Sequence, residues 1–440
     1  MMNPRNFFIQ TFGCQMNVYD SERIAQILAA RNYRQVDDPA RADLILINTC
    51  SVREKPEQKV YSALGRFRSL KKKNPKLIIG VGGCLAQQEG QKLLERVPFL
   101  DFVLGTKELP RVQEILDDLG RSGSRRCAVN LNGRINPYRG LPLSPVPGRA
   151  TSFVSIMQGC DNFCSFCIVP FVRGREVSRP IKDLLEEIGV LISQGVKEVI
   201  LLGQNVNSYG KQTPGEPTFV ELLERVGKIP EIERIRFTTS HPKDLSQGLL
   251  DAFGRLTKLC EHIHLPLQSG SNRVLQRMNR GYTREEYEEK VRNLRRTCPE
   301  ISITTDIIVG FPGEEEKDHR ETLEVIERIQ FDDLFSFRYS DRPHTRASFF
   351  PGKVEEEVKQ HRLSQVQSAQ KEITRRKNKA WEGRDVEVLV EGPSKIRPEE
   401  RTGRTRTNRI VNFAGDSPVG ALVRVRVRHP LAHSLRGELL

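Results

Sequence analysis

Three cysteines stand close together in the middle of the chain, at Cys160, Cys164 and Cys167. Their CxxxCxxC spacing lets three thiolates converge on one small inorganic centre. A structural zinc site needs four ligands, usually from two CxxC pairs, and the sequence has no second CxxC. A ferredoxin run would continue to a fourth cysteine followed by proline, which is absent here. The spacing favours a cubane cluster with one open iron; the alternative is a buried or redox CxxC pair beside a third cysteine.

A second set of cysteines is spread over the first hundred residues. Cys14, Cys50 and Cys84 each directly follow a short apolar run, in FGCQMN, NTCSVRE and GGCLAQQ. If those runs are parallel strands, their carboxyl ends share one edge of a sheet, where residues distant in sequence can meet. A single cysteine at a strand end is usually just a buried side chain. Three at equivalent places predict a second iron–sulfur site.

The third chemical signal is a cluster of arginines near the end of the chain. Between Arg401 and Arg428 there is one acid, Asp416, against seven arginines, at positions Arg401, Arg404, Arg406, Arg409, Arg424, Arg426 and Arg428. Alternation of valine and arginine over 423–428 places the last three arginines on one strand face. Such a face suits phosphate contacts with RNA, and the alternative is an edge strand protected by its charge.

Residues 1–122, which contain Cys14, Cys50 and Cys84, have the pattern of an α/β domain. Apolar runs at 7–13, 43–49, 76–83 and 101–106 alternate with helical patterns that begin near Ser21, Pro56, Gln87 and Glu108. Runs that are apolar throughout predict a parallel sheet covered on both faces. Residues 120–150, rich in Gly, Pro, Ser and Arg, read as a linker.

From residue 151 the alternation resumes, and it gives six further strand–helix units. The expected strands are 152–158, 198–203, 234–239, 262–267, 302–310 and 334–340. Six units form either a partial barrel or an open doubly wound sheet, and periodicity does not choose between them. A charged helix over 353–381 then leads to short alternating strands from Arg384 onward, which predict a small β-barrel.

Composition limits the class of protein. Lys and Arg number 70 against 56 Asp and Glu, a net charge of +14, which favours a polyanionic partner. The sequence has neither a signal peptide nor an apolar run long enough to span a bilayer, so we expect a cytoplasmic protein without membrane contact. In that reducing compartment the 9 cysteines suit metal chemistry better than disulfides.

The cysteine loop resembles that of the radical S-adenosylmethionine (SAM) superfamily, in which an aromatic residue, here Phe166, precedes the last cysteine. The resemblance implies a [4Fe-4S] cluster on Cys160, Cys164 and Cys167, with SAM chelating the open iron and cleaved to a 5′-deoxyadenosyl radical. It also implies SAM contacts from Gln204 and Asn205 after the second strand, and from Gly310 in the fifth. The organic chemistry belongs to the cofactor, and the protein supplies its orientation.

Over its whole length the chain resembles the methylthiotransferases, on segments such as TFGCQMNVYDSE, NTCSVREKPEQKVYSALGR and HLPLQSGSNRVLQRMNRGYT. The resemblance implies an N-terminal domain (1–122) whose Cys14, Cys50 and Cys84 hold an auxiliary [4Fe-4S] cluster. It further implies a radical SAM core (146–376) forming a partial (β/α)6 barrel, and an RNA-binding barrel of the TRAM type (377–440).

The segments look most like the branch that methylthiolates carbon 2 of N6-isopentenyladenosine at position 37 of tRNA. That branch implies SAM as both methyl donor and radical source, an electron donor such as flavodoxin or ferredoxin, and a monomeric enzyme. Two alternatives stay open: the branch that acts on N6-threonylcarbamoyladenosine in tRNA, and a non-enzymatic RNA-binding redox sensor.

Overall fold

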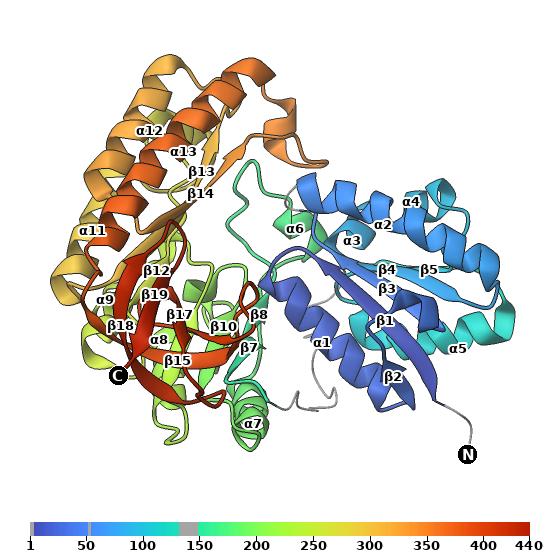
Figure 1. Ribbon diagram of the computed structural model, residues 1–440. Coiled ribbons are helices and arrows are strands. Elements are labelled where there is room, and N and C mark those ends of the chain that lie inside the picture. Colours follow the sequence, from blue (N-terminus) through green and yellow to red (C-terminus); the bar gives the residue numbers. More distant parts are fainter. Residues whose placement is uncertain (1–3, 52–53, 132–147) are drawn as a thin grey trace. The chain divides into compact units, whose positions relative to one another are not determined.

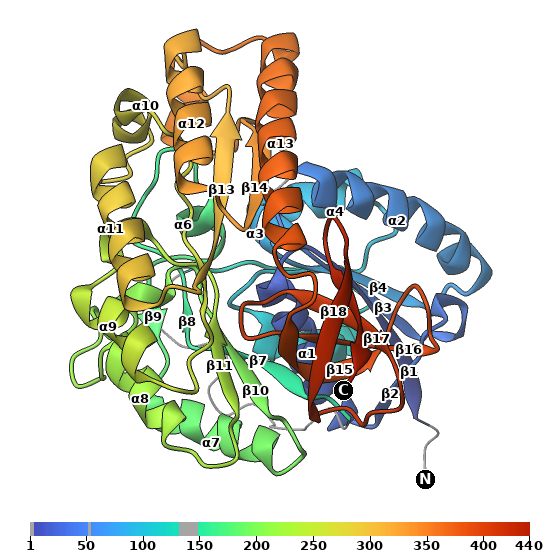
Figure 2. The same cartoon turned by 60° about the vertical axis from the view of Figure 1, so that its left-hand side comes forward.

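The computed structural model describes residues 4–51, 54–131 and 148–440. The chain divides into two compact units. The first contains Met1–Ser144 with the later segments Met157–Asp161 and Cys167–Arg179, and the second contains Pro145–Ile156, Asn162–Phe166 and Pro180–Leu440. Figures 1 and 2 show the elements of each unit.

The first unit is built on a six-stranded parallel sheet of order β2-β1-β3-β4-β5-β6. Its strands are β1 (Arg5–Phe12), β2 (Tyr33–Gln35), β3 (Leu44–Thr49), β4 (Ile78–Gly83), β5 (Phe102–Leu104) and β6 (Arg126–Ala128). Every residue of the central strand β3 is buried, because the Leu-Ile-Leu-Ile run is covered on both faces. The predicted parallel sheet is confirmed.

Helices cover both faces of this sheet. The helices are α1 (Gln15–Ala29), α2 (Glu54–Lys73), α3 (Cys84–Glu89), α4 (Gln91–Arg96) and α5 (Val112–Ser122), with 3-10 turns at Pro39–Arg41 and Leu109–Arg111. One apolar core contains side chains of α2, α3 and α4, and the other contains side chains of α1 and α5. In Figure 1 the two sets of helices lie on opposite sides of the strands. The segments from later in the chain add α6 (Val169–Val172) and an antiparallel pair, β8 (Met157–Gln158) with β9 (Val177–Ser178).

Several elements differ from the sequence-based prediction. The single helix expected from Gln87 is two helices, α3 and α4, with Gly90 between them, and α3 already begins at Cys84. Helix α1 begins at Gln15 rather than Ser21, because Cys14 is its N-cap and the Asn17 side chain accepts a hydrogen bond from the Cys14 backbone N–H. The strands β2 and β6 were not predicted, since each has three residues and lies at a sheet edge. The linker predicted from residue 120 therefore starts too early; its part at 132–147 lies outside the described residues.

The second unit carries six parallel strands, as predicted. They form two three-stranded sheets, β11-β10-β7 and β12-β13-β14, linked by a parallel bridge between Ile235 and Leu259. The strands are β7 (Thr151–Ser155), β10 (Glu198–Leu202), β11 (Arg234–Phe237), β12 (His262–His264), β13 (Ser302–Val309) and β14 (Asp333–Arg338). This is the expected partial (β/α)6 barrel.

Seven helices of this unit lie among the described residues: α7 (Ile181–Ile192), α8 (Phe219–Gly227), α9 (Gln247–Arg255), α10 (Asn272–Arg277), α11 (Arg284–Thr297), α12 (Glu316–Ile329) and α13 (Glu356–Lys379). Short 3-10 turns occur at Val206–Ser208, Pro242–Asp244 and Arg346–Phe349. Capping boxes fix two starts, since Thr218 pairs with Glu221 and Thr283 with Glu286. Both views show α12 and α13 side by side against β13 and β14.

The chain ends in a closed five-stranded barrel of order β15-β16-β17-β19-β18. Its strands are β15 (Asp385–Pro393), β16 (Glu400–Arg404), β17 (Ile410–Ala414), β18 (Leu422–Pro430) and β19 (Leu435–Leu439). The barrel core is largely valine, and Val425 and Val427 of β18 point into it. The predicted alternation is confirmed, because the arginines of β18 lie on the outer face.

Candidate active site and the two cysteine sets

The three cysteines of the first unit lie at the carboxyl ends of three adjacent strands. Cys14 follows β1 and caps α1, Cys50 follows β3, and Cys84 follows β4 as the first residue of α3. Cys50 and Cys84 are buried, and Cys14 is exposed. The Cys50 thiol is hydrogen-bonded to both Cys14 and Cys84. The fold thus brings together thiols that are 70 residues apart in sequence.

Two glycines let the strand ends approach one another at this edge. A Cβ on Gly13 would stand 2.6 Å from the Cβ of Cys50, and one on Gly83 would stand 2.6 Å from the Thr49 carbonyl oxygen. Both glycines also have positive φ, 144° and 93°. Buried amides brace the same edge, since Asn48 donates to the Asn17 carbonyl at 2.8 Å.

The proton affinities of the three thiols are coupled. The pKa of Cys14 is lowered to about 6 and that of Cys84 to about 7, first by hydrogen bonding with Cys50 and then by the nearby Arg173 guanidinium. The pKa of Cys50 is raised, first by its hydrogen bonding with Cys14 and Cys84 and then by burial. Thiolate, the form that ligates metals, therefore forms at Cys14 and Cys84 near neutral pH.

Arg173 comes from the segment Cys167–Arg179, which belongs to the same compact unit. Its Nη2 donates to Asp20 Oδ2 at 2.6 Å, with 3% and 0% of the two side chains exposed. Next to this pair, the Thr106 hydroxyl donates to the Val172 carbonyl at 2.6 Å. Val172 and Ile168 pack against Cys84. The residues just after Cys167 are thus held against the edge that carries the first cysteine set.

The second cysteine set occupies the loop between β8 and α6. Cys164 is buried, whereas Cys160 and Cys167 are half-buried. The loop turns through Gly159 at φ 81°, where a Cβ would stand 2.1 Å from the Arg175 carbonyl oxygen. Because six residues separate the outer cysteines, chain connectivity keeps all three thiols in one neighbourhood.

The Cys164 sulfur lies in a cationic environment that the sequence did not reveal. Arg280 Nη1 is 3.2 Å from Cys164 Sγ, and His241 Nε2 is 3.8 Å away. Burial and the nearby Arg280 lower the pKa of His241 to about 2, so its imidazole is neutral. Arg280 also donates to the Pro266 carbonyl at 2.7 Å, which fixes its guanidinium. A fixed guanidinium therefore lies within hydrogen-bonding distance of the Cys164 sulfur.

Polar groups gather where β10 and β11 end, in the same unit as Cys164. Asn205 donates to Asp244 Oδ2 at 2.8 Å and accepts the His241 backbone N–H at 3.1 Å, so much of its amide holds the protein together. Within the described residues, the amide of Asn207 and the hydroxyl of Ser240 are buried without a hydrogen-bond partner. Buried polar groups of this kind fit a polar ligand. Sequence reasoning missed both, since neither has a distinctive spacing.

The other residues expected to contact SAM take different places. Gln204 follows β10, directly before Asn205. Phe166 packs on an apolar cluster that contains Phe311 and Tyr339. Gly310 has φ 70°, and its close neighbour is the protein itself, because a Cβ there would stand 2.3 Å from Lys359 Cγ. Packing against Lys359 therefore already explains why this position is glycine.

Six of the seven arginines between Arg401 and Arg428 form ion pairs with acids. The pairs are Arg401–Asp416, Arg404–Glu391, Arg406–Glu261, Arg409–Asp332, Arg426–Asp385 and Arg428–Glu438, and Arg424 is exposed on β18. Two of these arginines, Arg406 and Arg409, pair with acids of the partial (β/α)6 barrel in their own unit. Arg406 also donates to the carbonyls of Thr257 and Leu259, and Arg409 lies over the Trp381 ring at 4.7 Å. In return, Arg236 of β11 donates to the carbonyls of Thr405 and Arg406.

The donor types fit iron–sulfur clusters at both cysteine sets. Across the described ranges, no group of three or more His, Cys, Asp or Glu side chains is placed so that it could hold a single metal ion. The fit therefore rests on three thiols per set, on the strand-end placement of the first set and on the glycines that would let backbone approach a cluster. Cationic Arg173 and Arg280 stand beside the two sets, where thiolate ligands concentrate negative charge.

Family models match three parts of the chain. Residues 6–105 match the uncharacterized protein family UPF0004, residues 154–326 match the radical SAM superfamily, and residues 379–440 match the TRAM domain. With the six-stranded fold and the cysteine loop, these matches define a radical SAM protein. Its cofactors are SAM and an iron–sulfur cluster.

Relatives that match the whole chain show to which family of radical SAM proteins it belongs. The chain is 52% identical to the tRNA-2-methylthio-N(6)-dimethylallyladenosine synthase of Syntrophus aciditrophicus (strain SB), over 100% of this chain and 95% of the relative. It is 51% identical to that of Geotalea uraniireducens (strain Rf4), over 100% of both. The chain belongs to the tRNA-2-methylthio-N(6)-dimethylallyladenosine synthase family.

Solved structures show the same fold at low sequence identity. The radical SAM methyltransferase TsrM from Kitasatospora setae, with cobalamin and a [4Fe-4S] cluster bound, matches with TM-score 0.59 and 14% identity, over 78% of this chain and 77% of that chain. The cobalamin-dependent SAM radical enzyme OxsB matches with TM-score 0.54 and 14% identity, over 84% and 56%. These likenesses concern the fold alone. Separately, no helix among the described residues is long and apolar enough to cross a membrane.

Proposed function

We propose that this chain adds a methylthio group to carbon 2 of N6-isopentenyladenosine at position 37 of tRNA. The observation that carries the proposal is the pair of separate three-cysteine sets, one on the radical SAM loop and one at the strand ends of the N-terminal sheet. Relatives about half identical over the full chain support the same reaction. One cysteine set suits radical initiation, and the other suits delivery of sulfur.

The second cysteine set, Cys160, Cys164 and Cys167, would hold the [4Fe-4S] cluster that binds SAM, and the first set, Cys14, Cys50 and Cys84, would hold the auxiliary cluster. When bound, these groups supply one-electron cleavage of SAM and a site for the sulfur to be methylated and transferred. The chain's part is to hold thiolates in place. Arg280 does so at Cys164, and Arg173 does so at Cys84 and Cys14.

SAM would lie beside the carboxyl ends of β10, β11 and β13. Gln204 and Asn205 are our proposed contacts for its methionyl amine, and Phe166 and Gly310 for its adenosyl side. The buried amide of Asn207 and the hydroxyl of Ser240 support a polar ligand at this end. Neutral His241 would add no repulsion toward a cationic sulfonium.

The remaining proposals concern domains and partners. We place the N-terminal domain at 1–122, the radical SAM core at 146–376 and the RNA-binding barrel at 377–440. An external donor such as flavodoxin or ferredoxin would supply electrons to a monomeric, cytoplasmic enzyme. On the barrel, the arginines that do not bind the core (401, 404, 424, 426 and 428) would contact RNA phosphates.

Nucleoside mass spectrometry of tRNA tests the reaction. A strain without the gene should accumulate N6-isopentenyladenosine without the methylthio group, and the parental gene should restore it. Accumulation of N6-threonylcarbamoyladenosine instead would assign the chain to the other tRNA branch. If purified, iron-loaded protein with reductant and SAM forms no 5′-deoxyadenosine, the chain is an RNA-binding redox sensor and the enzyme proposal fails.

A further inference from the structure

Helix α2 carries a run of basic residues from Lys59 to its end, whereas its two acids, Glu54 and Glu57, both stand near its start in the sequence. Residues 58–88 contain Lys59, Arg66, Arg68, Lys71, Lys72, Lys73 and Lys76 and no Asp or Glu. Among the described residues, Lys71 pairs with Asp101, whereas Arg66, Arg68 and Lys72 are exposed and form no ion pair. This contrasts with the barrel, where six of the seven arginines between Arg401 and Arg428 pair with acids. Cations without local partners favour a polyanionic partner.

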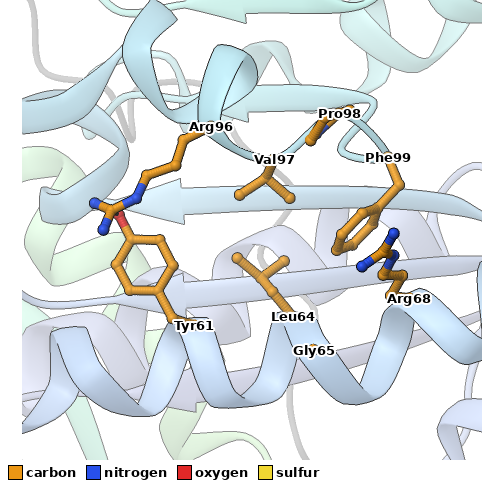
Figure 3. Close-up of a pocket in the computed structure, with 8 residues that line it drawn as sticks. All are labelled: Tyr61, Leu64, Gly65, Arg68, Arg96, Val97, Pro98 and Phe99. Carbon is orange, nitrogen blue, oxygen red and sulfur yellow. The ribbon is translucent and has the colours of Figure 1, made fainter.

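A hollow of about 480 Å³ opens beside this helix, between α2 and the end of α4 (Figure 3). Helical spacing places Tyr61, Gly65 and Arg68 on the side of α2 that lines it. Arg96 of α4 and Phe99, just before β5, line the opposite side. Figure 3 shows aliphatic Leu64 and Val97 between the two aromatic rings. The hollow therefore has an apolar middle and a ring with a guanidinium at each end.

Each end of the hollow is lined by one aromatic ring and one guanidinium group. The Arg96 guanidinium lies 4.5 Å from the centre of the Tyr61 ring, and its Nη1 donates to the Tyr61 hydroxyl at 3.1 Å. At the other end, Arg68 and Phe99 both line the hollow, and Figure 3 shows them on the same side of it. Aromatic rings and guanidinium planes stack on unpaired bases, and guanidinium groups bind phosphate.

Gly65 has no structural reason to be glycine. It lies inside α2, and a Cβ there would meet no atom within 4 Å. Its φ is not positive, so an L side chain would fit the backbone. Glycine weakens a helix interior relative to alanine. What the missing side chain does provide is open space above α2 in the hollow.

We propose that α2 and this hollow bind RNA, with one unpaired base over Gly65 and with Arg68, Lys72 and Arg96 at the flanking phosphates. The inference rests on the proposed function only in taking tRNA as the substrate. An acidic protein could also use the cations, but it would not need two aromatic rings around an apolar gap. Helix α2 begins four residues after Cys50 and is about 30 Å long, enough to follow several nucleotides.

Three variants of the full chain test the inference, with Arg34→Gln as the matched control because Arg34 is an exposed arginine on β2 of the same sheet. Binding of tRNA is measured by fluorescence anisotropy over a range of salt concentrations. Arg68→Gln and Arg96→Gln should each lower the slope of log affinity against log salt by about 0.7 to 0.9, and Arg34→Gln should not. Gly65→Leu should weaken binding roughly 5- to 150-fold, the loss of one stacked base, with the slope unchanged.

Thermal unfolding separates a loss of tRNA binding from a loss of folded protein. Leucine is a better helix former than glycine, so Gly65→Leu should melt no lower than the parent while it binds tRNA less tightly. Parental tRNA affinity in folded Gly65→Leu would overturn the inference. So would variants that bind tRNA normally but lose reduction by flavodoxin, since the surface would then dock an acidic protein. A parent that binds tRNA through α2 but never modifies it would overturn the proposed function and leave this inference standing.

Discussion

Removal of the Arg173 guanidinium should destabilise the N-terminal unit strongly. Arg173→Met leaves the Asp20 carboxylate, which is 0% exposed, without the cation that lies 2.6 Å away. Breaking a buried ion pair from one side costs about 3 to 5 kcal/mol, because the remaining charge stays in a poorly solvated site. Arg173→Met/Asp20→Asn removes both charges and should recover a large part of this loss.

Hydrogen exchange read by mass spectrometry measures the effect where it arises. Amides of β3, the central strand, report the free energy of opening of the unit. The control is Arg175→Met, because Arg175 pairs with Asp161 but its side chain is 60% exposed, and exposed pairs contribute at most about 1 kcal/mol.

An Arg173→Met loss no larger than that of the control would refute the reasoning. So would a double variant as unstable as Arg173→Met alone. Iron content gives a second readout: with the guanidinium absent, the first cysteine set should retain less iron than in Arg175→Met.

Two further predictions concern single residues. In iron-free protein, Cys14 should react with iodoacetamide with a midpoint near pH 6, because its lowered pKa makes it a thiolate above that pH, and a midpoint near 8.5 would contradict this. Gly310→Ala should lower the free energy of unfolding by about 1 to 3 kcal/mol in the absence of SAM, because φ is 70° and the new Cβ would overlap the Lys359 side chain. An unchanged melting temperature without SAM would contradict this packing role.

Much of the fold was readable because local signals agreed with it. The all-apolar run of β3 predicted a strand covered on both faces, and the Thr218 and Thr283 capping boxes fixed where α8 and α11 begin. The three-residue strands β2 and β6 were missed, since so short a run has no period, and their pairing depends on the neighbouring strand.

Of the candidate site, the sequence predicted the clustering of the cysteines but not the arginines beside them. Strand-end placement predicted that Cys14, Cys50 and Cys84 would meet, whereas the arginines beside the two sets depend on tertiary contacts. Arg173 and Asp20 are 153 residues apart, and nothing local in either segment marks the other. Arg406 is paired with Glu261 across 145 residues, a contact that a charge count alone does not predict.

That pairing also changes what removal of the barrel would do. In the structure, Arg234 and Arg236 of β11 are buried and donate to Glu387 and to barrel carbonyls, so deletion would expose part of the core. Point substitutions on the outer face of the barrel are therefore the cleaner test of RNA contact.

The measurement that tests the two-site account most directly is a comparison of two triple variants in anaerobic, iron-reconstituted protein. With Cys14, Cys50 and Cys84 all replaced by Ala, iron should fall from about eight to about four per chain. This variant should still cleave SAM to 5′-deoxyadenosine while forming no methylthiolated nucleoside. With Cys160, Cys164 and Cys167 replaced, both products should be lost. Unchanged iron content, or continued methylthiolation of tRNA, in the Cys14/Cys50/Cys84 variant would contradict the account.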